Sequence, residues 1–423
     1  MGSVMAIRPS RRAGKRAGLF VAVLVLLCLN AASGMCGDWP QFRGPARDGK
    51  STDTGLMKQW PADGPEMVWS YGELGHGYSS VAVADGRIYT TGLEGRNAVM
   101  YVFDQKGQLL WKKPYGQGWT RSTPGARGTP TIDDGLAYVM TGNGEIACFD
   151  AKSGDQKWAV DLKRQYRAKI ISWGMVESLL IDGDNLICTP GGTVAVVALN
   201  KKTGQEVWKC TDISDASAYC SPIIVKRGNR RLIVTLMANA FIGVDADKAK
   251  LLWRHPRDVS WKIHAVSPVY DDGRVFITAG YGGNRSELFE LSANGDGITK
   301  KPCDRALDCH HGGVIALNGH VYGASDKNSR GSWICQSMAT GQVVATTPAV
   351  KKGSIAYADG MFYGYGENGT VGLIDPSPKD FKMVSSFRIT KGAKQHWAHP
   401  AIANGTLYIR HGAFLMAFDV KAK

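Results

Sequence analysis

Short hydrophobic runs rich in β-branched and aromatic residues recur along the chain, and each follows a glycine turn, in most cases Asp-Gly or Asn-Gly. The turn glycines are Gly86, Gly135, Gly183, Gly228, Gly273, Gly319, Gly360 and Gly405. Such pairs between apolar runs predict two-residue β-hairpins. Their spacing of 41 to 49 residues fits a four-stranded propeller blade. The pattern therefore predicts an all-β, eight-bladed β-propeller of four-stranded antiparallel blades.

A second pattern follows the turns and decays in the later blades: Asp or Asn, a glycine four residues later, and Trp after four more. Asp150, Gly154 and Trp158 form the clearest copy, and a second runs from Asn200 to Trp208. Asp and Gly are typical of a tight turn, here between the third and fourth strands. We expect each indole to pack flat between neighbouring blades, with a structural role.

The two ends of the chain predict how the ring closes. The last repeat supplies only three strands, near Ala401, Leu407 and residues 414–418, and residues 66–71 supply a suitable fourth. We therefore expect the N- and C-terminal strands to share the last blade, which leaves no open edge in the ring. Residues 66–423 would form this single domain, and residues 35–65 an N-terminal segment before it.

The first 34 residues predict a cleaved signal peptide. Basic residues precede an apolar run at 17–29, which is shorter than the ~20 residues that cross a bilayer, and small residues follow it. An uncleaved membrane anchor is the alternative. Export to the periplasm or the medium follows, and it permits disulfides, for which Cys210 with Cys220 and Cys303 with Cys309 are candidate pairs.

Charge and composition exclude some partners. Without residues 1–34 the net charge falls from +14 to 46 − 37 = +9. The basic residues are not clustered, so we expect no nucleic-acid partner. Membrane contact would be peripheral at most, and we expect a monomer.

The strand, Asp-x-x-x-Gly and terminal Trp pattern resembles the pyrroloquinoline-quinone-type repeat propellers, from about residue 38 to the C-terminus. Residues 38–45, Asp-Trp-Pro-Gln-Phe-Arg-Gly-Pro, resemble the opening of exported, uncharacterised, dehydrogenase-like members. The resemblance implies the propeller but does not decide whether a quinone binds.

The loops that lead into each first strand would line one mouth of the central channel, where propeller ligands bind. These loops are rich in aromatic and polar residues. The candidate binding residues are Trp173, Glu177, Trp261, Trp397 and Arg127.

Two chemistries are possible there. The resemblance implies a pyrroloquinoline quinone stacked on a channel tryptophan beside calcium, as in a quinone-dependent alcohol dehydrogenase of the polyvinyl-alcohol type. The chain lacks the adjacent-cysteine pair of such enzymes, and Glu177 has no evident Asn and Asp partners for calcium. Alternatively, His264, His310, His311 and His399 could hold a metal ion. Adjacent histidines in a strand or turn usually point apart, so we do not expect His310 and His311 both to face one ion.

The favoured interpretation needs no cofactor. The chain resembles the propeller scaffold of the outer-membrane β-barrel assembly machine, although it lacks that protein's lipidation motif. We expect an exported binding or scaffold module whose channel mouth takes an envelope protein, a peptide or a glycan through aromatic and cationic groups.

Overall fold

The computed structural model describes residues 37–281, 285–326 and 331–423, which belong to one compact unit, residues 34–423. The predicted signal peptide, residues 1–34, lies outside the described residues. Among the residues described, no helix has the length and apolar character needed to cross a bilayer.

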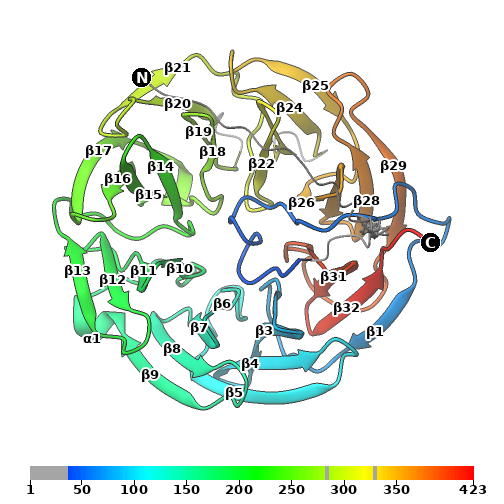
Figure 1. Cartoon of the computed structure of the whole chain (residues 1–423), viewed down its shortest axis with the longest axis horizontal. Helices are drawn as coiled ribbons and strands as arrows, with labels where there is room; N and C mark the ends of the chain where they lie inside the picture. The colour runs from blue at the N-terminus through cyan, green and yellow to red at the C-terminus, as the bar shows by residue number, and fades with distance from the viewer. Residues whose placement is uncertain (1–36, 282–284, 327–330) are drawn as a thin grey trace, which may run out of the picture. The chain divides into compact units, whose positions relative to one another are not determined.

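The described chain forms eight four-stranded antiparallel sheets arranged as a ring, and the chain passes round the ring in sequence order (Figure 1). Blades 1 and 2 contain β2 (Ala82–Ala84), β3 (Arg87–Glu94), β4 (Asn97–Asp104), β5 (Leu109–Gln117), β6 (Thr131–Asp133), β7 (Leu136–Met140), β8 (Glu145–Asp150) and β9 (Gln156–Asp161). Blades 3 and 4 contain β10 (Leu180–Asp182), β11 (Asn185–Cys188), β12 (Val196–Asn200), β13 (Glu206–Cys210), β14 (Ile223–Arg227), β15 (Arg230–Leu236), β16 (Ala240–Asp245) and β17 (Lys250–Pro256). A short helix α1 (Leu162–Tyr166) and a 3-10 turn η1 (Ser260–Lys262) lie between blades.

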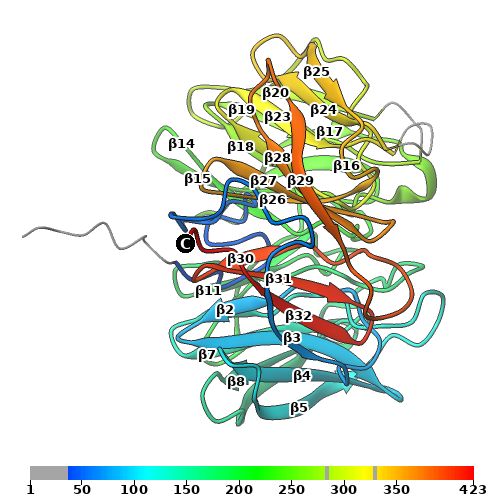
Figure 2. The same ribbon diagram turned by 90° about the vertical axis from the view of Figure 1, so that its right-hand side faces the viewer.

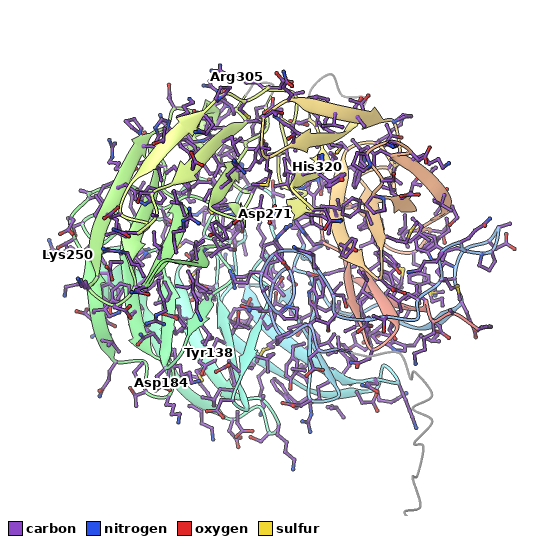
Figure 3. All side chains as sticks on the ribbon, turned by 45° about the horizontal axis from the view of Figure 1, so that its top comes forward. Tyr138, Asp184, Lys250, Asp271, Arg305 and His320 are labelled. Carbon is purple, nitrogen blue, oxygen red and sulfur yellow. The ribbon has the colours of Figure 1, made fainter. Side chains whose placement is uncertain are left out.

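The second half of the ring repeats this arrangement. Blades 5 and 6 contain β18 (Val269–Asp271), β19 (Arg274–Ile277), β20 (Glu287–Leu291), β21 (Ile298–Lys301), β22 (Val314–Leu317), β23 (His320–Ala324), β24 (Trp333–Ser337) and β25 (Val343–Thr347). Blade 7 contains β26 (Gly353–Ala358), β27 (Met361–Gly366), β28 (Thr370–Asp375) and β29 (Lys382–Arg388), and blade 8 contains β30 (Ala401–Ala403), β31 (Thr406–His411), β32 (Phe414–Asp419) and β1 (Met67–Tyr71). Seen from the side, the blades stand next to one another round the ring (Figure 2). Side chains fill the layers between them, and Lys250 of β17 marks the outer edge (Figure 3).

The predicted closure of the ring is confirmed. Strand β1 pairs antiparallel with β32, with Met67 opposite Phe418 and Tyr71 opposite Leu415. The outer strand of blade 8 thus comes from the start of the domain and its other three strands from the end. Shared strands tie the two ends of the chain together, so the ring has no open seam.

The hairpin prediction is also confirmed, because the turn glycines adopt the left-handed backbone that the tight turn requires. Gly86 and Gly135 both have φ of 72°, and the aspartates before them, Asp85 and Asp134, have φ of 50°. Two successive positive φ values are the mark of a type I′ turn.

The repeated tryptophans, where they occur, join neighbouring blades, as predicted. The indole of Trp158 in blade 2 lies against Gly204 in blade 3, and its Nε1 donates to Lys201 O at 3.0 Å. Trp111 of blade 1 likewise donates to Lys152 O of blade 2 at 3.1 Å. Glycine is required at this position of the repeat for two reasons. Its φ is positive, and the indole of the preceding blade occupies the space that a side chain would need.

Alanine at Gly204 is therefore expected to cost more stability than alanine at Gly135. The two glycines share nearly the same φ, 73° and 72°, but a Cβ at Gly204 would lie 2.7 Å from Trp158 Cε3, whereas a Cβ at Gly135 meets nothing within 4 Å. We expect a loss of ~1–2 kcal/mol for Gly135→Ala from backbone strain alone, and ~1–3 kcal/mol more for Gly204→Ala from the clash. Thermal denaturation of both variants measures the difference, and equal shifts in Tm would contradict the docking role of the indole.

The disulfide prediction is wrong. The described cysteines, Cys210, Cys220, Cys303 and Cys309 among them, are free thiols. Cys210 and Cys220 pack into two different hydrophobic clusters in spite of their closeness in sequence. Burial raises the pKa of Cys220 to about 11 and that of Cys309 to about 12, so both behave as small apolar side chains at neutral pH.

The N-terminal segment crosses the centre of the ring, where it is drawn in dark blue (Figure 1). It approaches from the face that carries the hairpin turns: Trp39 pairs with Val83 of β2, and Leu56 N donates to the side chain of Asp359 in the turn of blade 7. The channel is therefore closed from this face by the protein's own chain.

Candidate functional site

A cavity of about 250 Å³ lies at the mouth of the channel on the other side of this segment. The loops that lead into the first strands of blades 1 to 6 and 8 supply most of its wall, which agrees with the placement expected from the sequence. Its lining consists of Phe42, Tyr78, Thr123, Arg127, Trp173, Val176, Ser178, Tyr219, Ser221, Ile263, Ala265, Tyr281, His310, His311, Trp397 and His399. Aromatic and imidazole rings dominate this wall, and Arg127 is its one lysine or arginine.

The N-terminal segment forms the base of the cavity. Phe42 lines it, and the next residue, Arg43, is buried and donates to the backbone oxygens of Val314 and Asp48. Arg47 is also buried and donates to Ser178 O at 2.7 Å and to Pro222 O at 3.0 Å. Since Ser178 and Pro222 precede β10 and β14, the two arginines fix the segment to several blades at once.

Aromatic side chains line two arcs of the wall. On the side of blades 8 and 1, Trp397 packs against Tyr78 with ring centroids 5.1 Å apart. On the side of blades 3 and 4, Trp173 packs against Tyr219 at 6.2 Å, and its backbone N–H donates to the Tyr219 hydroxyl. Trp261, 73% exposed, meets Trp173 edge-on at 6.3 Å and extends this arc to the rim.

Arg127 positions the second of these arcs. Its guanidinium donates to the backbone oxygens of Trp173 and Thr123, in two neighbouring loops. Burial lowers the pKa of Arg127 from its ordinary value of 12.5, and the nearby phenols of Tyr78 and Tyr219 oppose that shift. The group therefore stays a cation at neutral pH and brings a positive charge to the cavity.

Two histidines of the wall, His310 and His399, are held neutral by burial. Burial lowers the pKa of His310 and of His399 to about 3. His399 Nε2 lies 2.8 Å from His311 O, so it must donate there, and its Nδ1 keeps a lone pair that has no partner among the described residues. The Nε2 of His311 lies 2.9 Å from a carboxylate oxygen of Glu367, in blade 7. As neutral imidazoles, His310 and His399 serve as hydrogen-bonding groups.

The adjacent histidines do not point apart as expected. His310 and His311 both line the cavity, and their ring centroids are 4.7 Å apart. The expectation extended the alternation of a strand to turns, but both residues lie in a bend before β22, where that alternation does not apply.

The other residues predicted for the site do not all line the cavity. Trp173, Trp397 and Arg127 line the cavity, and Trp261 stands at its rim. Glu177 is buried outside the lining, where its Oε2 accepts from the hydroxyl and the backbone N–H of Thr189. Burial raises the pKa of Glu177 to about 7, so this carboxyl group carries only part of a charge at neutral pH.

Within this arrangement, the side chains do not fit a quinone held beside calcium. Calcium takes six to eight oxygen ligands, with carboxylates prominent among them, whereas the cavity lining contains no Asp or Glu. Glu177, the one carboxylate proposed for this role, is bound to Thr189.

The four histidines are not brought together either. His264 is fully buried, and the lining contains its neighbours Ile263 and Ala265 but not His264 itself. In residues 37–281, 285–326 and 331–423, no three or more His, Cys, Asp or Glu side chains are grouped in a way that could hold a metal ion.

Several residues of the site were not found from the sequence. Phe42, Arg43 and Arg47 come from the N-terminal segment, and Tyr281 and Glu367 come from loops between second and third strands. The one signal for the first group is the Phe-Arg-Gly of residues 42–44, which stands outside the repeat. Arg43 and Arg47 have φ of 64° and 57°, a strained backbone that marks a constrained position but is not visible in the sequence.

Comparison with known proteins supports the same architecture. A family model described as outer membrane protein assembly factor BamB matches residues 57–161 and 96–347. The BamB protein of Salmonella typhimurium is 26% identical over 208 residues, which cover 48% of this chain and 48% of that protein. The quinohemoprotein alcohol dehydrogenase ADH-IIG of Pseudomonas putida is 28% identical over 156 residues, which cover 34% of this chain and 21% of that enzyme. The chain thus spans less than half the length of the curated relatives it matches.

Solved structures show the same fold at low identity. The crystal structure of BamB from Moraxella catarrhalis is similar with a TM-score of 0.60 at 16% identity, covering 85% of this chain and 98% of that one. Quinohemoprotein alcohol dehydrogenase from Comamonas testosteroni is similar with a TM-score of 0.65 at 13% identity, covering 91% and 81%. A BamB protein and an alcohol dehydrogenase share the propeller fold, so function has to be argued from the cavity.

Proposed function

Because this chain belongs to the family described as outer membrane protein assembly factor BamB, we propose that it is an exported binding module of the cell envelope. Its channel mouth holds a ligand or a segment of a partner, which is an envelope protein, a peptide or a glycan. The observation that carries the proposal is the aromatic cavity itself, closed below by the N-terminal segment and open at the other face.

The construction of the cavity supports binding in preference to redox catalysis. Ligand sites are concave, mostly apolar and equipped with a few convergent polar groups. Here aromatic rings supply the apolar wall, and Arg127, His399 and Tyr219 supply the polar groups. Rigid side chains such as Trp and Tyr lose little conformational entropy on binding, which makes them efficient contact residues.

The alternative, quinone-dependent alcohol oxidation, is favoured by the likeness to quinohemoprotein alcohol dehydrogenases. The side chains of this chain argue against it, because no carboxylate lines the cavity beside the tryptophans. We therefore assign the cavity to ligand binding.

The proposal is tested by retention on the immobilised mature protein. We expect at least one component of an envelope extract to be retained by the wild type and lost with the double variant Trp173→Ala, Trp397→Ala. The two substitutions remove one indole from each aromatic arc of the cavity wall. Val207→Ala, at a 52% exposed side chain on β13, is the matched control and should retain the component. Equal retention by all three proteins, with Tm values that show all three folded, would contradict a role for the cavity.

A further inference from the structure

We propose that the ligand combines an aromatic ring with a carboxylate, as the C-terminal aromatic residue of a polypeptide or a small aromatic acid does. The inference rests on the proposed function, since it names the chemistry that the cavity binds.

Four arginines surround the cavity: Arg43, Arg47 and Arg410, which are buried, and Arg127, which is half-buried. Arg127 lines it, and Arg47 donates to the backbone of Ser178 in its wall. A Cβ built at Gly313 would lie 2.1 Å from Arg43 Nη1 and 2.9 Å from Cε1 of the cavity residue His399, so Arg43 reaches this ring. A Cβ built at Gly77, the residue before Tyr78, would lie 2.3 Å from Arg410 Nη2.

None of these four guanidinium groups is in an ion pair within the described parts of the chain. Arg47 and Arg127 donate to backbone oxygens, and Arg410 donates to Thr91 O and the Ser79 hydroxyl. The buried Nη1 of Arg43 and Nη2 of Arg410 have no acceptor among residues 37–281, 285–326 and 331–423. Hydrogen bonds to neutral oxygens satisfy the N–H groups but leave the charge in place.

The positive charges persist at neutral pH and are only partly balanced. Burial lowers the pKa values of Arg43, Arg47 and Arg410 to about 10, so all three remain protonated. Of the acids nearby, Glu177 has a pKa of about 7, and Asp48 lies 3.0 Å from Lys50 Nζ. Charges in a cleft with low-dielectric walls act more strongly than the same charges in water.

The acidic groups on the rim are already paired. Asp326 lies 2.7 Å from Lys352 Nζ, and Glu367 lies 3.4 Å from the same nitrogen and 2.9 Å from His311. They therefore cancel little of the positive charge at the base of the cavity. An anionic group in the cavity would be stabilised by the buried arginines, whereas a cationic group would be repelled.

The size and shape of the cavity indicate which group accompanies the carboxylate in the ligand. A volume of about 250 Å³ lies just below the ~300–1,000 Å³ of pockets that hold drug-sized ligands, which suits one large side chain and not a folded loop. The walls carry rings in two arcs, Tyr78 with Trp397 and Trp173 with Tyr219. Aromatic pairs gain stability beyond the burial of their area, so a planar ring is the best-matched body for the carboxylate. Trp261 at the rim is placed to contact the residues that precede a chain terminus.

The test compares two probes that differ only in charge: the peptide acetyl-Gly-Gly-Ser-Phe as the free acid and as its C-terminal amide. Titration followed by calorimetry or tryptophan fluorescence should show the acid binding the mature protein at least roughly tenfold more tightly than the amide. Phenylpropionate and its amide form a second pair. Binding of the small acid as tight as that of the peptide would indicate a small-molecule ligand, and tighter peptide binding a chain terminus, both in support.

Arg127→Gln gives a readout that structural damage alone would not produce. Loss of the charge should reduce the ratio of acid to amide affinity towards one, whereas a loosened cavity would weaken both probes alike and leave the ratio unchanged. Arg121→Gln, at a cation that lies over Trp119 and not in the cavity lining, is the matched control and should keep the wild-type ratio.

The inference is overturned if acid and amide bind equally or if a peptide with a basic terminus binds better than the acid. It is also overturned if neither probe binds while an envelope component is still retained through Trp173 and Trp397. In that last case the proposed binding function survives, so the failures of the two proposals are distinguishable.

Discussion

Lowering the pH below about 6.5 is expected to destabilise the propeller, because its buried histidines take up protons only when it unfolds. Burial lowers the pKa values of His264 and His399 to about 3, against 6.5 in the unfolded chain. Their contribution to stability is therefore complete above pH 6.5 and is lost as the pH falls towards 3. Each contributes up to ~1.4 kcal/mol per pH unit in this window.

Glu177 acts in the opposite direction. Its pKa in the folded protein, about 7, lies above the ordinary 4.5. Its contribution to the free energy of unfolding is therefore complete below pH 4.5 and is lost as the pH rises through 7. From pH 6.5 to 4.5, the two histidines cost ~5 kcal/mol and Glu177 returns up to ~3 kcal/mol. His310 and His396, whose pKa values burial lowers to about 3 and about 4, add to the loss. The net change is destabilising.

The measurement is the free energy of unfolding in urea at several pH values. In His264→Gln the slope against pH between 6.5 and 4.5 should fall by the equivalent of one proton, whatever the variant's stability at pH 7. His320→Gln, at a half-buried histidine of β23, serves as the control. Slopes that are the same in all three proteins would show that His264 is not the group that titrates on unfolding.

Arg47→Met is expected to lower stability by ~4 kcal/mol, since it leaves buried backbone oxygens without a donor. The arginine donates to Leu179 O and to Gln41 Oε1, both at 2.9 Å, in addition to Ser178 O and Pro222 O. Methionine has a similar length and keeps the φ of 57° without these bonds. At ~2.1 cal/mol/K of unfolding entropy per residue, this loss corresponds to a fall in Tm of ~5 °C for a unit of this size.

Differential scanning calorimetry of Arg47→Met beside Lys50→Met measures this effect. Lys50 lies on the same segment but pairs with Asp48 at a partly exposed position, so its loss should change Tm little. If both variants melt together with the wild type, Arg47 does not hold the segment in the channel.

The repeat is the part of this protein that the sequence made predictable. The glycine turns and the tryptophans recur at intervals that local backbone chemistry explains, so the blades, their order and the pairing of β1 with β32 could all be predicted. The same periodicity placed Trp173, Trp397 and Arg127 at one mouth of the channel, because each precedes an innermost strand. Interactions between residues close in sequence repeat with the blade and are therefore visible in the sequence.

The base of the cavity and its electrostatics were decided by tertiary structure. The repeat pattern does not indicate that Arg47 donates to backbone oxygens more than 130 residues away. Nor does it indicate that Glu367 of blade 7 contacts His311 in the loop before blade 6. Loop side chains do not alternate as strand side chains do. The sequence therefore could not show that Glu177 binds Thr189 outside the cavity lining while His310 and His311 both line the cavity. The sequence by itself determined the propeller ring and the end of its central channel at which the cavity lies. Packing between distant segments decided which side chains face that cavity and what charge they give it, because burial and contact at long range set those properties.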